Sequence, residues 1–347
     1  MYFSADTGRG YHIWRQRYPN GVPEQVTATA TEEQGISFAA DGRSFVTSVG
    51  ERLSTIWVHD ARGEREITSQ GYAFQPAFSV DDKHLYYLQR ARDNRRFVSG
   101  ELWSVVLDTG KRERLLPDFL MEHYSVAPDG NHVTFVSVDD AGHSSVWIAT
   151  LDGSVAPRRL SSLDSVRARF GTGNDVFFVG GETTTSMFLY RVKEDGSGLQ
   201  KMSPNRVLFL YDVSPDGKWA SVWQLDDNAV AVYSTESDAR TIVCTHCGTA
   251  GEENRGVTPP LVSWSRDGKY LFLHYTGSRE TYALPLAAGR MVPNLPEAGF
   301  ESIKSAAAGL GAKPIADLRA FPSSDPSVYA FPRPTAHRNI YRITVPE

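Results

Sequence analysis

The stretch Val213-Ser214-Pro215-Asp216-Gly217-Lys218-Trp219 carries the pattern that decides the fold of this chain. An apolar residue is followed, after two spacers, by Asp-Gly and then by a run of residues that favour β-strands. Asp-Gly between two such runs is typical of a hairpin turn. The same pattern recurs at residues 38–42, 126–130 and 264–268, with Asp-Asp in place of Asp-Gly at 78–82 and weaker copies at 170–174 and 321–326.

A second anchor follows each turn, an aliphatic residue directly before an aromatic one. Ile56-Trp57 and Val146-Trp147 are examples, and a short strand with polar flanks, such as Glu66-Ile67-Thr68, comes after them. Each repeat therefore predicts about four strands. The full set of aliphatic-aromatic anchors is residues 13–14, 56–57, 102–103, 146–147, 189–190, 232–233, 281–282 and 340–341. In the seventh anchor, threonine replaces the aliphatic residue.

A repeat of roughly 45 residues with four antiparallel strands is typical of a β-propeller blade. Helical repeats of this length would need apolar residues about 3.6 residues apart. In these segments apolar and polar residues alternate instead, or the apolar run is short. The sequence therefore predicts an all-β propeller of four-stranded antiparallel blades with WD-like repeats. Eight aliphatic-aromatic anchors but only seven inner-strand turns are recognisable. Eight imperfect blades are favoured, and seven is the alternative.

We expect one propeller domain over residues 1–347. Residues 1–30 would supply the three outer strands of a partial first blade, residues 31–315 six blades, and residues 316–347 a partial last blade. The two ends duplicate each other's strands, so we do not expect them to complete one blade together. This duplication suggests that Met1 begins partway through a longer propeller region.

The repeat spacing stretches at residues 244–260 and 287–316, which predicts insertions at blade edges. Residues 301–308 in the second insertion are expected to form a short helix before Gly309. Insertions of this kind map to loops on one face, where propellers usually bind. We therefore expect an unidentified protein or small-molecule ligand on one propeller face.

The charge and the apolar runs of the chain argue against two classes of partner, nucleic acids and the membrane interior. The chain has 36 Lys and Arg against 41 Asp and Glu, which gives a net charge of −5, and 41% of its residues are hydrophobic. This charge provides no basic surface of the kind that a phosphate backbone requires, so we expect no nucleic-acid partner. No apolar run reaches about 18 residues, so we expect no membrane insertion by this chain. Its first residues resemble no secretory signal.

The motifs of catalysis are missing from the sequence. A protein kinase would need a glycine-rich loop, a catalytic His-Arg-Asp and an Asp-Phe-Gly, and a serine hydrolase of the α/β type would need Gly-x-Ser-x-Gly. We therefore assign no catalytic, cofactor-binding or metal-ligating residue and expect no enzyme. The alternative is a propeller hydrolase or lyase acting on carbohydrate or peptide. Its site would lie at the mouth of the central channel, assembled from several blades.

The two cysteines of the chain lie three residues apart in Cys244-Thr245-His246-Cys247. A structural disulfide is the favoured interpretation, and two unpaired thiols are the main alternative. A zinc site would need four ligands, which this segment does not supply alone. A redox Cys-x-x-Cys would open a helix in a βαβ unit, which is missing here.

The Ser-Pro-Asp-Gly-Lys pattern at residues 214–218 resembles the repeat of TolB-like propellers. Residues 10–17, 57–65 and 338–343 are more similar to the C-terminal propeller of membrane-anchored bacterial serine/threonine protein kinases, a group abundant in acidobacteria. This resemblance implies a sensor propeller in an extracytoplasmic compartment, with kinase activity in an N-terminal domain that this chain lacks. The implied role rests on analogy, because fold alone does not set function.

Overall fold

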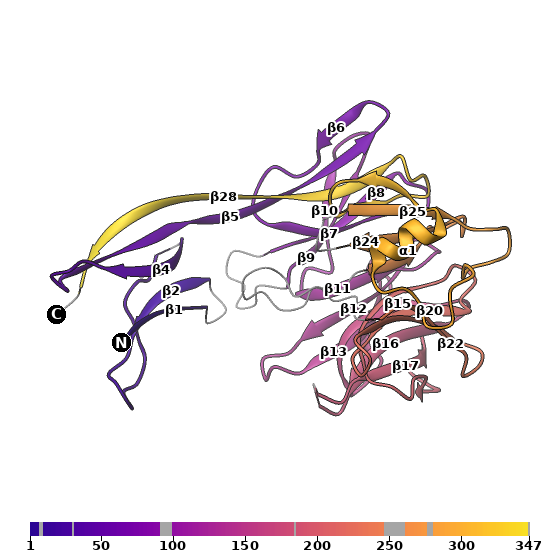
Figure 1. The fold of residues 1–347 in the computed structure, drawn as a ribbon, viewed down its shortest axis with the longest axis horizontal. Coiled ribbons are helices and arrows are strands. Elements are labelled where there is room, and N and C mark those ends of the chain that lie inside the picture. The colour runs from indigo at the N-terminus through magenta and orange to yellow at the C-terminus, as the bar shows by residue number, and fades with distance from the viewer. Residues whose placement is uncertain are drawn as a thin grey trace.

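The computed structural model describes residues 1–6, 10–29, 31–90, 99–183, 185–245, 261–275 and 280–345. Their strands form seven antiparallel sheets, and only one α-helix, α1 (Ile303–Leu310), occurs in this part of the chain (Figure 1). The all-β propeller predicted from the repeat is therefore confirmed. No helix among these residues is long and apolar enough to span a membrane.

Five of the sheets have four strands each in simple chain order. The first two contain β7 (Ala73–Phe78), β8 (His84–Gln89), β9 (Glu101–Val106), β10 (Arg112–Leu115), β11 (Met121–Val126), β12 (His132–Val138), β13 (Ser144–Thr150) and β14 (Arg158–Arg159). The third and fourth contain β15 (Asp164–Phe170), β16 (Asp175–Gly181), β17 (Phe188–Lys193), β18 (Gln200–Lys201), β19 (Val207–Val213), β20 (Trp219–Gln224), β21 (Ala229–Ser234) and β22 (Arg240–Cys244). The fifth contains β23 (Leu261–Trp264), β24 (Tyr270–Tyr275), β25 (Glu280–Pro285) and β26 (Lys313–Ala316).

The other two sheets are formed by the ends of the chain. One has three strands, β1 (Tyr2–Asp6), β2 (Tyr11–Arg15) and β3 (Glu24–Gln25). The other runs in the order β27 (Phe321–Pro322), β28 (Tyr329–Thr344), β5 (Ser44–Asp60), β4 (Glu32–Phe38), and β6 (Gly63–Glu66) also pairs with β5.

The repeated Asp-Gly turns have the same local hydrogen bonds in three blades. In the turn after β19, Asp216 Oδ1 accepts from the Ser214 hydroxyl at 2.6 Å and from the Lys218 amide at 3.1 Å, while Gly217 has a φ of +70°. Glycine adopts this left-handed conformation without steric cost. Ser79 with Asp81 and Ser265 with Asp267 repeat the arrangement. The sequence pattern is thus explained by turn chemistry.

Hydrophobic side chains of neighbouring blades pack together between the sheets. One such cluster joins Leu88 and Leu102 of one blade to Tyr124 and Phe135 of the next, all at most 5% exposed. Trp147, one of the repeated aromatic anchors, packs against the same cluster. Burial of this kind is the main favourable contribution to the fold.

Residues from both ends of the chain close the ring of blades. The first part of β28 pairs with the last part of β5, with Tyr329 opposite His59 and Phe331 opposite Trp57. β6 pairs with the other edge of the same segment of β5. The order β27-β28-β5-β6 therefore completes a four-stranded blade. The expected partial last blade is completed by β5 and β6, and residues 1–30 take no part in it.

Beyond this blade, β5 and β28 continue together as a long ladder away from the ring (Figure 1). Both chain ends lie at its far end, where β4 pairs with β5 and the β1-β2-β3 sheet contacts β4. We call the described parts of residues 1–53 and 335–345 the arm. The eighth anchor, Ile340-Tyr341, lies in this ladder opposite Ser48 and Thr47, so it adds no further sheet.

The predicted short helix is present, shifted by two residues from 301–308 to Ile303–Leu310. Ser302 caps its N-terminus, because the Ser302 side chain accepts from the Ser305 amide and the Ser305 hydroxyl accepts from the Ser302 amide. This reciprocal capping favours a start at residue 303. Gly311 ends the helix with a φ of +72°.

The closing blade provides a test of the ring. Phe331 is 2% exposed, whereas Ile340, on the same strand but in the arm, is 72% exposed. We expect Phe331→Ala to lower the free energy of unfolding by about 3 to 5 kcal/mol because it leaves a cavity in the closing blade. Ile340→Ala should change it by less than about 0.5 kcal/mol. Urea unfolding followed by tryptophan fluorescence measures both, and equal effects would contradict closure by β28.

Candidate functional site at the centre of the propeller

Four arginine side chains from three blades meet at the centre of the ring. Arg167 and Arg169 lie on the inner strand β15, where the two-residue period of a strand places them on the same face. Arg266 lies in the turn after the inner strand β23, and Arg319 lies just before the inner strand β27. Arg266 and Arg319 are exposed to water, and Arg167 and Arg169 are partly exposed. These side chains are therefore surrounded by the blades and still in contact with water.

The four guanidinium groups are close enough to repel one another. Burial among the blades lowers the pKa of each of them, and the charge of Arg169 lowers the pKa of Arg167 further. The pKa of Arg167 falls to about 9. This group is still protonated at neutral pH, so the centre of the ring carries several positive charges.

Arg169 is held by several partners. Its Nη1 donates to His123 Nε2 at 2.6 Å and to the Tyr124 carbonyl at 3.2 Å, and its Nε donates to the Tyr211 carbonyl at 3.1 Å. Asp212 Oδ1 lies 3.7 Å from Nε. Burial, with the charges of Arg169 and Arg167, keeps the pKa of His123 well below its usual value. His123 is therefore a neutral acceptor here.

Asp212 is the carboxylate of this central group. Its Oδ2 accepts from the Trp264 amide at 2.9 Å, which joins β19 to the neighbouring blade. Burial raises the pKa of Asp212, while Arg169 and Arg266 oppose that rise. Arg266 also donates to the carbonyl of Phe78 across the ring. Arg169 and Arg266 thus both have structural partners.

Arg167 and Arg319 differ from the other two arginines. The side chain of neither arginine forms a hydrogen bond or an ion pair with any residue in the described part of the chain. The Cζ atom of Arg167 lies 4.5 Å from the ring centroid of Phe209 and 6.0 Å from that of Tyr211. The Cζ atom of Arg319 lies 5.1 Å from the centroid of Phe321. Both guanidinium groups are therefore held by aromatic rings and have no carboxylate opposite them among these residues.

Tyr211 lies beside both of these arginines. It is 3% exposed, and its hydroxyl has no hydrogen-bond partner among the described residues. Burial raises the pKa of Tyr211, and the charges of Arg167 and Arg319 oppose that rise. The Cζ atom of Arg167 lies 6.0 Å from the ring centroid of Tyr211. A buried hydroxyl without a partner is costly, so this one indicates a vacant donor or acceptor position.

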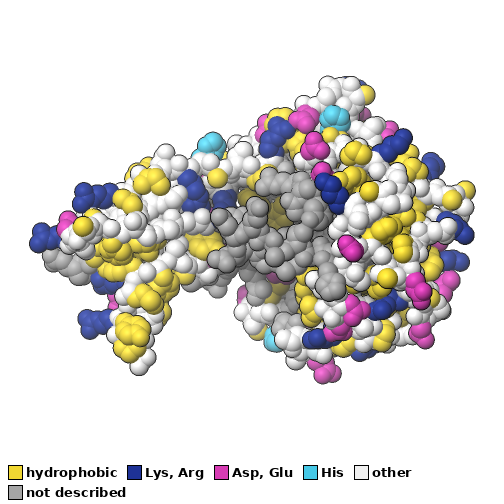
Figure 2. All heavy atoms as spheres, viewed as in Figure 1, with side chains coloured by type: hydrophobic (Ala, Val, Ile, Leu, Met, Phe, Trp, Pro, Cys, Tyr) yellow, Lys and Arg dark blue, Asp and Glu magenta, His cyan; other side chains and the backbone are white. Residues whose placement is uncertain are grey.

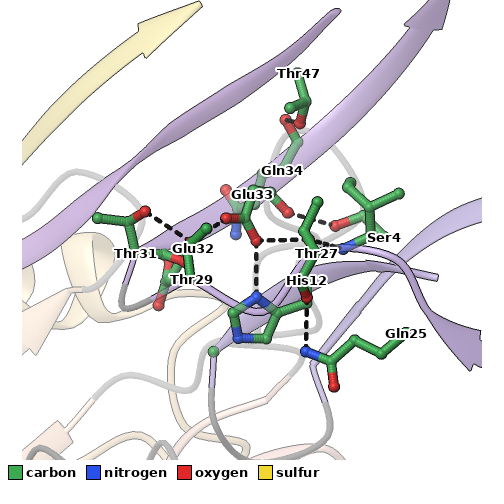
Figure 3. A network of polar contacts seen from close by, with 12 residues as sticks. Ser4, His12, Gln25, Thr27, Thr29, Thr31, Glu32, Glu33, Gln34 and Thr47 are labelled. Atoms are coloured by element: carbon green, nitrogen blue, oxygen red, sulfur yellow. Dashed lines mark hydrogen bonds and ion pairs between the residues drawn. The ribbon is translucent and has the colours of Figure 1, made fainter. Parts of the chain in front are cut away.

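A second polar cluster lies in the arm (Figure 3). His12 Nδ1 and Glu33 Oε2 are 2.7 Å apart, and both residues are buried. The Thr27 hydroxyl donates to the same carboxylate at 2.9 Å, and the Thr29 hydroxyl donates to its other oxygen. A buried His-Glu pair beside hydroxyl groups has the composition of a catalytic site.

The repeat gives this arm cluster a structural explanation. The Thr27 hydroxyl accepts from the Ile13 amide at 2.9 Å. Two blades of the ring have the same contact, between Thr68 and the Ile56 amide and between Ser203 and the Leu189 amide. In these blades, therefore, the hydroxyl group that follows the outermost strand accepts a hydrogen bond from the third strand and holds it in place. We interpret the arm cluster as a reinforced version of this contact.

The cysteine segment is only partly described. Cys244 is disulfide-bonded and fully buried in a hydrophobic cluster, whereas Cys247 and the rest of the expected insertion from residue 246 to 260 lie outside the described residues. Within the described ranges, no group of three or more His, Cys, Asp or Glu residues could hold a metal ion.

Sequence reasoning assigned no residue to the centre of the ring. The usable signal was the segment Val166-Arg167-Ala168-Arg169-Phe170, in which two arginines alternate along an inner strand. Inner strands face the centre of a propeller, so this alternation directs both charges there. Arg266 and Arg319 lie outside strands and have no comparable signal.

Comparison with known proteins identifies the fold. No family model matches the sequence, and no curated protein matches it. The structure of a TolB-type protein from Agrobacterium tumefaciens has a TM-score of 0.55 at 14% identity, and the match covers 82% of this chain and 99% of that one. TolB from Acinetobacter baumannii has a TM-score of 0.50 at 14% identity, covering 81% of this chain and 75% of that one.

An oligogalacturonate lyase solved in complex with manganese is less similar. Its TM-score is 0.48 at 10% identity, over 78% of this chain and 80% of that one, which is too low to carry an argument. At these identities structural similarity establishes the fold alone. The chain therefore has a TolB-like β-propeller fold.

The arm cluster gives a prediction about local stability. Glu33→Ala should leave the buried His12 and Thr27 side chains without their acceptor, at about 1 to 3 kcal/mol for each of these two groups. We expect limited proteolysis to cut first within residues 1–53 of this variant, while the ring stays intact. Glu51→Ala, at an exposed arm position, is the control. Identical cleavage of the two variants, identified by mass spectrometry, would contradict this role.

His274 gives a prediction about pH. Burial and the charge of Arg319 lower the pKa of His274 to about 3. An unfolded chain takes up this proton below about pH 6.5, whereas the folded protein does not until about pH 3. The stability due to neutral His274 is therefore complete above pH 6.5 and is lost as the pH falls, by about 1.4 kcal/mol per pH unit.

We expect His274→Asn to flatten the pH dependence of urea unfolding between about pH 5 and 6.5. His143→Asn is the matched control, because the His143 side chain is 66% exposed. An unchanged slope in His274→Asn would show that His274 already titrates normally in the folded protein.

Proposed function

We propose that this chain is a non-catalytic binding or sensing propeller and that its ligand binds at the centre of the ring. The observation that carries this proposal is the pair Arg167 and Arg319, two cations without a hydrogen-bonding partner in the described structure beside the unsatisfied hydroxyl of Tyr211. Polar groups converging in a concave, wetted site are the usual mark of a ligand site.

The arginines with partners give this site rigidity. Arg169 and Asp212 join four blades through side-chain and backbone contacts. Arg266 joins a fifth blade through the carbonyl of Phe78. A ligand at the centre would therefore meet groups that are already positioned, which lowers the entropic cost of binding.

We further propose that the propeller serves as the extracytoplasmic sensor of a larger protein, such as a membrane-anchored serine/threonine kinase. The support is the sequence resemblance at residues 10–17, 57–65 and 338–343, together with the disulfide at Cys244. Disulfides persist mainly in oxidising compartments. The neighbouring gene sequence tests this proposal, because a reading frame that does not continue into a membrane segment and a kinase domain would contradict it.

The binding proposal is tested with a panel of anionic, neutral and cationic small molecules, including sugars and short peptides. We expect some of them to raise the melting temperature and to slow amide hydrogen exchange in β15, β19 and β23, while exchange in β1 and β2 stays the same. Protection confined to the arm or to outer strands, or no binding at all, would contradict a site at the centre.

The same incubations distinguish binding from catalysis. Mass spectrometry of each bound compound, before and after incubation with the protein, should show no product. A product that forms in proportion to protein concentration would support the alternative of a propeller hydrolase or lyase.

A further inference from the structure

We infer that the ligand at the centre of the ring is an oxyanion, a carboxylate or a phosphate, held between Arg167 and Arg319 with the Tyr211 hydroxyl as a third donor. This inference rests on the proposed function, since it names the chemical class that the central site binds. It is carried by the charges, by the aromatic neighbours of the two guanidinium groups and by the vacant hydroxyl.

The charges at the centre do not balance. Four guanidinium groups face two nearby carboxylates, Asp212 and Asp82, and Asp212 already interacts with Arg169. The two buried histidines of the region, His123 and His274, both have pKa values lowered by burial and by these cations, so both are neutral and neither changes the charge of the centre. The centre is therefore positive in a chain whose net charge is −5.

The aromatic neighbours of Arg167 and Arg319 leave the donors of both side chains available. The Cζ atom of Arg167 lies 4.5 Å from the ring centroid of Phe209, and that of Arg319 lies 5.1 Å from the centroid of Phe321. A cation beside an aromatic ring is attracted by the π-electrons, and this attraction provides no carboxylate or carbonyl oxygen for its five N–H donors. In-plane donors of two arginines match the oxygen atoms of a carboxylate or a phosphate. The aromatic rings thus position the cations without using their hydrogen bonds.

Arg333 shows what a paired arginine looks like in the same protein. Its Cζ atom lies 4.0 Å from the ring centroid of Trp57, and its Nη2 lies 2.6 Å from Glu64 Oε2. This arginine therefore has both an aromatic neighbour and a carboxylate. Arg167 and Arg319 have the aromatic neighbour, and an oxyanion would take the place of the carboxylate.

Repulsion between the central arginines gives the inference a second measurable consequence. In the absence of an anion, the repulsion between Arg167 and Arg319 lowers the stability of the folded protein, because like charges in a partly buried site repel. Removing one of them should therefore stabilise the anion-free protein while weakening the binding of an anion. A purely structural arginine would do the opposite, since its loss would lower stability.

The experiment uses the full chain and four variants, Arg167→Gln, Arg319→Gln, Tyr211→Phe and the control Arg333→Gln. Calorimetric titration and melting curves are recorded with citrate, inorganic phosphate and glucose, at an ionic strength held constant with sodium chloride. Citrate and phosphate distinguish the two sources of the oxyanion. Glucose is the neutral probe.

We expect citrate or phosphate, but not glucose, to bind the unmodified protein and to raise its melting temperature. Arg167→Gln and Arg319→Gln should each weaken the Kd by about tenfold or more, as the loss of a charge-assisted hydrogen bond predicts. Tyr211→Phe should weaken it by less, and Arg333→Gln should leave it unchanged. Without an anion, Arg167→Gln and Arg319→Gln should melt at the same or a higher temperature than the unmodified protein.

Three results would overturn the inference. Anion binding that survives both arginine variants would place the oxyanion elsewhere, and equal weakening by Arg333→Gln would show a general effect of charge. A central ligand that is neutral or cationic would contradict the oxyanion while leaving the proposed function intact. Only the absence of any ligand at the centre of the ring would contradict both the oxyanion inference and the proposed function.

Discussion

The pairing of β5 with β28 is the constraint on which the rest of the structure depends. It joins residues 44–60 to residues 329–344 along one continuous ladder. One end of this ladder supplies two strands of the closing blade, and the other end forms the core of the arm. Arg319 stands just before this blade, so its place at the centre of the ring also follows from the closure. A non-local contact thus positions part of the candidate site.

The centre of the ring shows how a repetitive fold can form an irregular site. Each blade contributes an inner strand of similar shape, but the side chains that face the axis differ between blades. Arg169 and Asp212 are satisfied by neighbouring blades, and that satisfaction holds the inner strands in place. Arg167 and Arg319 are not satisfied in this manner. The contrast between Arg169 and Arg266, which have structural partners, and Arg167 and Arg319 is the basis on which we propose that the latter two face a ligand.

The arm cluster illustrates the opposite case. A buried histidine, a glutamate and two threonines suggest chemistry when they are considered alone. The contact between Thr27 and the Ile13 amide is repeated by Thr68 and Ile56 in the ring. Because the same hydroxyl contact recurs where no histidine or glutamate accompanies it, its first role is to hold strands together. Comparison between repeats therefore distinguishes structure from function within one chain.

The sequence by itself determined the all-β propeller, its hairpin turns and its short helix, because Asp216-Gly217 and its copies act through neighbouring residues. The alternation of Arg167 and Arg169 was present in the sequence, but no site residue was predicted from it. Tertiary structure decided which strands complete the last blade, that Ile340-Tyr341 joins the sheet of β5, and that Arg266 and Arg319 reach the centre. These outcomes depend on pairing and charge between residues far apart in the chain, and local spacing carries no information about such contacts.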